Sequence, residues 1–175
     1  MDGITTFWVG AWVLALVFAF YRLRWVEAQN QGTAEMVTIA GHIREGAMAF
    51  LRREYRVLAL FVALIAILLA LGYRDEERLI AVSFVAGALC SGLAGFIGMW
   101  AATASNSRTT HAARSSLNSA LGVAFSGGSV MGLSVAGLGV MGLSLLFILY
   151  DQRIASDDPD HLVQVMTIMA GFSLG

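Results

Sequence analysis

The segment Asp157-Asp158-Pro159-Asp160 carries three carboxylates within four positions. Oxygen ligands of this kind suit hard divalent cations such as Mg²⁺ or Ca²⁺, so one interpretation of the segment is a metal site. The other is a solvated loop that separates two helices. The loop is the preferred interpretation, and no metal ligand is assigned in this segment.

The remaining candidates for chemistry are histidines and glycines. His42, His111 and His161 are scattered, with no second histidine or carboxylate at the spacing that a zinc site needs. Gly127 and Gly128 have only a superficial likeness to a phosphate-binding loop, because no lysine follows them and they lie within an apolar stretch. Helix packing is therefore the preferred role of this glycine pair.

Asn106 and Arg108 stand at the end of another apolar stretch. A guanidinium there could meet a phosphate or a lipid headgroup, but anchoring at the membrane interface is the preferred interpretation. No apolar stretch carries an ionisable residue at its centre, which would be the usual mark of an ion path. The residues by themselves thus identify no catalytic, cofactor-binding or metal-ligating side chain.

The composition of the chain and the length of its uncharged stretches predict the helices that carry these residues. The chain has 175 residues, of which 58% are hydrophobic and 13% are charged, whereas a soluble domain is about 45–50% apolar and about 25% charged. Several stretches free of ionisable residues approach or exceed the roughly 20 residues that a membrane-spanning helix needs. We predict an all-α, polytopic transmembrane bundle forming one domain over residues 1–175. Its spans are expected at about 3–21, 50–73, 79–105 and 118–150, with the start of a fifth at about 163–175.

One of these spans is predicted to begin well outside the bilayer. Gly32 provides a plausible break and Thr33 a helix N-cap. Apolar residues then recur at steps of three or four over residues 36–51, with charged residues on the other face. We expect one long helix from about Glu35 to Tyr73, whose first half projects from the membrane.

Arginine counts predict the orientation. Alternate connections hold eight of the eleven basic residues, all of them arginine, and the opposite side holds three. The positive-inside rule then places the amino terminus outside a cell membrane and loops 22–56 and 106–117 in the cytoplasm. The formal net charge of -1 makes nucleic acid an unsuitable partner, and the lipid bilayer is the expected one.

Small residues at intervals of four predict close helix packing in lipid. The third span carries Gly87, Ser91 and Gly95, and the fourth carries the series 128, 132 and 136 (Gly, Gly, Ala). Both spans are therefore expected to be surrounded by other helices.

Three segments resemble the membrane-bound, ion-translocating inorganic pyrophosphatases. Residues 43–55 (IREGAMAFLRREY) are similar to the family pattern IxEGAxAFLxxxY, and residues 98–110 (GMWAATASNSRTT) to GMxxATxANxRT. Residues 124–133 (AFSGGSVMGL) look like the start of the family's fourth helix. The order and gaps of the three segments are specific, and the resemblance extends from about residue 7 to residue 175.

The resemblance implies a pump that couples pyrophosphate hydrolysis on the cytoplasmic side to outward transport of H⁺ or Na⁺. It also implies Mg²⁺ as cofactor, a homodimer, and further carboxyl-terminal helices as partners of this chain. In the family, the helix that residues 166–175 begin continues into RVGGG and KAADVGADLVGK, and such later motifs supply the metal-binding carboxylates and a lysine for pyrophosphate. Neither motif is in this sequence.

The chain is therefore expected to be the amino-terminal part of such a pump and inactive alone. Its expected cytoplasmic segments offer Glu27, Glu35, Glu45 and Glu54. The last three stand ten and nine positions apart on one predicted helix, roughly 13–15 Å per step, too far to share metal ions about 4 Å apart. The alternative is a small, non-catalytic helical membrane scaffold or subunit with similar packing motifs.

Overall fold

The computed structural model describes residues 3–154 and 161–175, which form five α-helices, one short 3-10 helix and no strand. The all-α prediction is confirmed. The elements are α1 (Gly3–Glu27), α2 (Ala34–Gly72), η1 (Asp75–Arg78), α3 (Leu79–Ala113), α4 (Leu117–Arg153) and α5 (His161–Leu174). In these residues, α1 to α4 are long and apolar enough to cross a membrane, and α5 is shorter.

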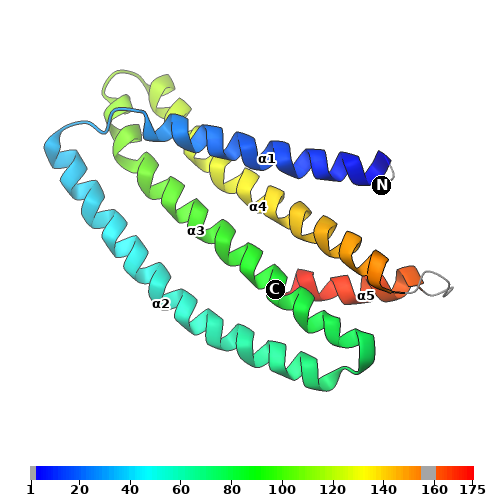
Figure 1. Cartoon of the computed structure of the whole chain (residues 1–175). Helices are drawn as coiled ribbons and strands as arrows, with labels where there is room; N and C mark the ends of the chain where they lie inside the picture. The colour runs from blue at the N-terminus through cyan, green and yellow to red at the C-terminus, as the bar shows by residue number, and fades with distance from the viewer. Residues whose placement is uncertain (1–2, 155–160) are drawn as a thin grey trace.

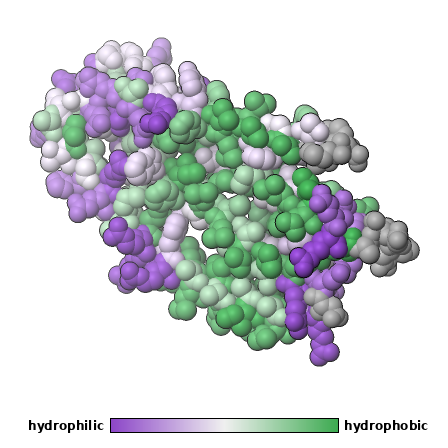
Figure 2. Space-filling view, viewed as in Figure 1, coloured by the Kyte–Doolittle hydropathy of each residue, from purple (hydrophilic) through white to green (hydrophobic). Residues whose placement is uncertain are grey.

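The hydrophobic surface agrees with a membrane location. In Figure 2 hydrophobic side chains cover the middle of the visible face, and hydrophilic ones gather at the two ends. A water-soluble protein would bury most of this surface, whereas a bilayer solvates it without cost. The chain is a multi-pass membrane protein.

The helix α2 is continuous from Ala34 to Gly72, as the sequence predicted. Before it, Gly32 adopts a φ of 92°, a value that favours glycine, and its amide donates to the Asn30 side chain at 2.9 Å. The Thr33 hydroxyl then accepts from the Met36 amide at 3.4 Å, so the predicted N-cap is present.

The central helix is α3, which packs against α4, α2, α5 and α1. Figure 1 shows α2 on one side of α3 and α4 on the other, with α1 lying along α4. Midway along α2, the Tyr55 hydroxyl donates to the Gly92 carbonyl of α3. This bond joins the two helices at a fixed register.

A compact core forms where α3, α4 and α5 meet. The Tyr150 side chain is 1% exposed, and its hydroxyl lies 2.9 Å from that of Ser83, so this buried polar pair is satisfied. The side chains around it are aliphatic: Ile80, Ile154, Val165 and Ile168.

The predicted small-residue stripe on α4 contacts no other helix among the residues that the structure describes. Gly128 and Gly132 have open space where a side chain would project, and Ala136 is exposed. The packed glycines lie on another face of α4: a Cβ at Gly127 would meet Ser105, and one at Gly142 would meet Phe172. In a glycine-rich helix an interval of four occurs on several faces, so spacing alone did not select the buried one.

The predicted stripe on α3 is right at two of its three positions. A Cβ at Gly87 would meet the Phe172 backbone, and one at Gly95 would lie 3.0 Å from the Tyr55 hydroxyl. Ser91 is exposed. Helix α3 thus presents different glycines to α5 and to α2.

Candidate functional site

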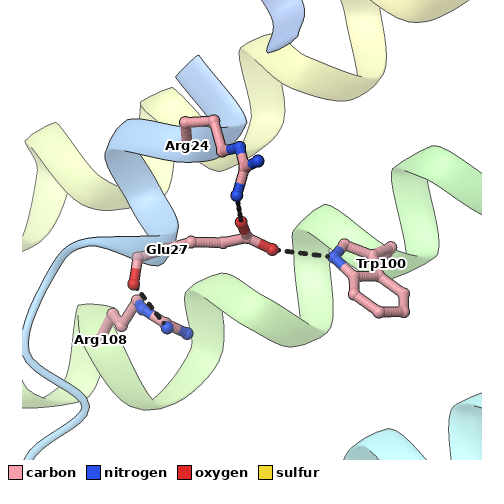
Figure 3. Close-up of polar contacts among 4 residues, drawn as sticks. All are labelled: Arg24, Glu27, Trp100 and Arg108. Carbon is pink, nitrogen blue, oxygen red and sulfur yellow. Dashed lines mark hydrogen bonds and ion pairs between the residues drawn. The ribbon is translucent and has the colours of Figure 1, made fainter. Parts of the chain in front are cut away.

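A group of polar side chains joins α1, α2 and α3 at the end of the bundle that holds the α1–α2 connection. We call it the polar clasp and define it as Arg24, Glu27, Arg44, Trp100 and Arg108. Figure 3 shows all of these except Arg44, with Arg24 and Glu27 on α1 and the other two on α3.

Arg108 lies in the last turns of α3 and is 8% exposed. Its guanidinium donates to the carbonyl of Glu27 at 2.8 Å, of Gln29 at 3.2 Å and of Ala104 at 2.6 Å. The first two acceptors are at and just beyond the end of α1, where helical carbonyls have no partner within the helix and carry the negative end of the helix dipole. Arg108 therefore caps α1 from a neighbouring helix.

The electrostatics of Arg108 follow from this position. Its side chain is largely buried, and all three of its hydrogen bonds go to backbone carbonyls. Arginine stays protonated in proteins even at buried positions. The clasp thus contains a permanent, largely desolvated positive charge that is balanced by backbone carbonyls and by Glu27.

The Glu27 carboxylate binds two side chains of unequal importance. Oε1 accepts from the Trp100 indole nitrogen at 3.2 Å, across the boundary between α1 and α3. Oε2 is 3.9 Å from Arg24, whose side chain is 68% exposed. Exposed ion pairs at this distance contribute little stability, so the indole bond is the interaction that orients the carboxylate.

The third helix of the clasp is joined through the ring of Trp100. The Arg44 guanidinium of α2 lies over this indole with its carbon 3.7 Å from the ring centroid. Such cation–π contacts stabilise by about 0.5–2 kcal/mol, depending on exposure. One tryptophan therefore contacts α1 through its edge and α2 through its face.

Arg108 is not the expected anchor at the membrane interface, because its largely buried guanidinium donates to backbone carbonyls at the end of α1. The same bonds turn it away from the alternative partners considered above, a phosphate or a lipid headgroup. Helix α3 continues to Ala113, beyond the predicted end of the span at residue 105. Arg108 is thus a helical residue facing α1, while Asn106 of the same turn is exposed.

No metal-binding group of three or more His, Cys, Asp or Glu side chains occurs in residues 3–154 and 161–175. Glu35, Glu45 and Glu54 all lie on α2, ten and nine positions apart. His42 is exposed on α2, and His111 lies near the end of α3 beside the Gly32 turn. Residues 157, 158 and 160, considered above as metal ligands, lie outside the described residues.

His161 has a carboxylate partner that sequence spacing did not indicate. Its Nε2 is 3.1 Å from Oδ1 of Asp151, and the pair joins the start of α5 to the end of α4. The two residues are ten positions apart, a separation that does not by itself predict a contact between the ends of two helices.

Sequence reasoning also missed the contacts that Glu27, Arg44 and Trp100 make with one another. Two features of the sequence could have pointed to these contacts. The residues lie toward predicted helix ends, and they include charged side chains that the membrane interior would exclude. Neither signal gives the lateral arrangement of the helices. Among the clasp residues, Arg108 and Glu27 were singled out from the sequence, but the contact between them was not predicted.

Comparison with known proteins adds a family match. The family described as inorganic H⁺ pyrophosphatase matches residues 13–175. A putative K⁺-stimulated pyrophosphate-energized sodium pump of Bacteroides thetaiotaomicron is 39% identical over 183 residues, which cover 100% of this chain and 25% of that protein.

Two further relatives are named as proton pumps. The K⁺-insensitive pyrophosphate-energized proton pump 2 of Moorella thermoacetica is 49% identical over 118 residues, covering 67% of this chain and 17% of that protein. The K⁺-insensitive pyrophosphate-energized proton pump of Caldanaerobacter subterraneus is 34% identical over 187 residues, covering 100% of this chain and 26% of that protein. The chain spans about a quarter or less of the length of these relatives.

Proposed function

The chain belongs to the inorganic H⁺ pyrophosphatase family, and on that premise we propose that residues 1–175 form the amino-terminal part of a pump that couples pyrophosphate hydrolysis to outward transport of H⁺ or Na⁺. The family match confirms the resemblance of the three sequence segments. The observation that carries the proposal is similarity along the whole chain to relatives named as pyrophosphate-energized pumps. One of these relatives is named a sodium pump and the other a proton pump, so the proposal includes both ions.

The hydrolytic site is proposed to lie outside this chain. Hydrolysis in such a pump requires metal ions, expected to be Mg²⁺, that clamp phosphate oxygens and activate a water. The described residues do not fit such a site, because no three of their His, Cys, Asp or Glu side chains lie close enough to hold one metal ion. The glutamates of α2 are too far apart along the helix to share metal ions. We therefore derive no catalytic step from these residues.

The proposed contribution of this chain is to position other parts of the pump. The polar clasp fixes the end of α1 relative to α3, and α3 relative to α2. By the arginine distribution, this end of the bundle faces the cytoplasm, with the amino terminus outside. Further carboxyl-terminal helices, and a second copy of the pump, are the partners proposed for the exposed helix faces.

A non-catalytic membrane scaffold is not favoured as the alternative. Packing motifs shared by chance would produce local similarity in the glycine-rich helices. The observed similarity instead covers 100% of the chain in two relatives, including the polar segments between the helices.

Ion transport by a chimaera tests the proposal. In this chimaera, residues 1–175 replace the matching part of the Caldanaerobacter subterraneus relative, and the protein is placed in inverted membrane vesicles. We expect pyrophosphate to drive uptake of H⁺ or Na⁺ into these vesicles and not into vesicles that hold residues 1–175 alone. Absence of uptake from a folded, membrane-inserted chimaera would contradict the proposal.

A further inference from the structure

Helix α2 lies at one edge of the bundle and packs through only part of its surface (Figure 1). Of the described elements, it contacts only α3 and η1. Its face toward α3 includes the stacked Arg44, the buried Leu51 and the hydrogen-bonded Tyr55. The other faces of α2 are therefore open to partners outside residues 1–175.

One of these open faces is apolar and repeats at alternating steps of four and three residues. Ile39, Ile43 and Phe50 are 54%, 48% and 60% exposed, and Gly46 has open space where a side chain would project. At 3.6 residues per turn, this face lies roughly 130° around the helix from the face toward α3. We call it the α2 seam and define it by six residues: Ile39, Ile43, Gly46, Phe50, Arg53 and Val57.

The spacing of the α2 seam is that of a helix–helix contact. Steps of four and three average 3.5 residues, the repeat that keeps the side chains of one helix against a second helix along its length. Gly46 leaves an open position between larger residues, so a side chain of the second helix can enter there. Contact with lipid chains requires no such repeat. The spacing therefore indicates a helix as the occupant of the seam.

The first half of the α2 seam lies outside the hydrocarbon core of the membrane. Arg52, Arg53 and Arg56 are exposed, and exposed charged side chains are excluded from that core. Ile43 and Ile39 precede Arg52 by 9 and 13 residues, which is about 14 and 20 Å along the helix axis. Lipid chains do not reach them there. Apolar side chains that are exposed beyond the core indicate a contact with protein.

The charge of Arg53 argues against a second copy of α2 as this protein partner. Two copies in one membrane share their orientation, so a closed dimer has its two-fold axis along the membrane normal and pairs equivalent residues. Contact through the α2 seam would bring the two copies of Arg53 together, and like charges at short range repel. A helix of different sequence can instead place a carboxylate opposite this guanidinium.

The longer relatives leave room for such a helix. The matched residues make up 25% of the Bacteroides thetaiotaomicron pump, so three quarters of that protein lies outside the part that this chain matches. We propose that the α2 seam packs against one helix from the carboxyl-terminal remainder of the same polypeptide, and that this helix carries a carboxylate opposite Arg53. The inference rests on the proposed function, in which residues 1–175 are the amino-terminal part of a longer pump.

Photo-crosslinking in the full-length pump that carries this chain tests the proposal. The photoreactive amino acid p-benzoylphenylalanine takes the place of Phe50, and membrane vesicles that hold the pump are irradiated. We expect a cross-link to a peptide from beyond residue 175, in a band of monomer size after denaturing electrophoresis. The same amino acid in place of Glu45, which is exposed on α2 outside the seam, is the control and should give no such peptide.

A charge reversal tests the carboxylate that we assign to the partner helix. Arg53→Glu should remove most of the cross-link from position 50, because two carboxylates would then face each other. Arg52→Glu, at an exposed arginine outside the seam, is the matched control and should retain the cross-link. An undiminished cross-link in Arg53→Glu would overturn the assignment of the carboxylate.

Other occupants of the seam give different products. A cross-linked dimer would show a second copy, a lipid adduct would show lipid, and the absence of any adduct would show water. Each of these products would overturn the proposal, as would a cross-link within residues 1–175. Pyrophosphate-driven ion uptake is measured in the same vesicles. A pump that transports ions but lacks the expected cross-link contradicts this inference alone, whereas absence of uptake in the unmodified pump contradicts the proposed function.

Discussion

The Arg108 guanidinium lies 2.8 Å from the backbone carbonyl oxygen of Glu27, although 81 positions separate the two residues. The bond joins the end of α3 to the end of α1 and places a cation at the negative end of a helix dipole. Because Glu27 also binds Trp100 through its side chain, one residue of α1 is held at two points by α3.

Replacing Arg108 should weaken the bundle. Arg108→Gln removes charge-assisted bonds to the Glu27 and Gln29 carbonyls, which contribute about 1.5–3 kcal/mol. We expect the free energy of unfolding, measured in detergent, to fall by about 2 kcal/mol. Arg108→Lys should not restore it, because an ammonium lacks the planar fork that reaches both carbonyls. Arg114→Gln, at an exposed arginine of the same region, is the matched control and should have little effect.

The stacking of Arg44 on Trp100 should be measurable as a coupling energy. A double-mutant cycle with Arg44→Gln and Trp100→Leu should give a coupling of about 0.5–1 kcal/mol in unfolding experiments. The same cycle with exposed Arg53 in place of Arg44 should give a value near zero. Equal coupling in the two cycles would mean that the stacking has no specific effect.

The helices were predictable from the sequence because each depends on local information. The length of the stretches without charged residues gives the number of long apolar helices. The Thr33 cap, followed by apolar residues at steps of three or four without a break, predicts α2 as one helix. The clasp was not predictable, because contacts such as that between Glu27 and Trp100 depend on the lateral order of helices. The spacing of the α4 glycines was insufficient for the same reason: it shows that several faces of a helix carry small residues, but not which face the helices of this chain cover.

The two kinds of glycine on α4 should respond differently to a bulky side chain. Gly127→Leu should destabilise residues 1–175 by about 1–3 kcal/mol, because its Cβ would collide with Ser105 of α3. Gly132→Leu should have little effect in the same unfolding measurement, since that position is open. Similar losses for both variants would contradict this assignment of the packed face.

The orientation of the chain is tested by cysteine accessibility in a Cys90→Ala background. Gln31 and Glu77 are exposed at opposite ends of α2. In intact cells, a membrane-impermeant thiol reagent should label Glu77→Cys, and it should label Gln31→Cys only after the membrane is opened. The reverse pattern would show that the arginine asymmetry had been misinterpreted.

The most direct test of the central claim is Mg²⁺-dependent release of phosphate from pyrophosphate by two purified proteins. Residues 1–175 alone should release none above a blank, because the described residues provide no cluster of carboxylates for metal ions. The chimaera with the remainder of the Caldanaerobacter subterraneus relative should hydrolyse pyrophosphate. Release by residues 1–175 alone that is abolished by replacing Glu35, Glu45 or Glu54 with Gln would contradict the claim that the hydrolytic site lies outside this chain.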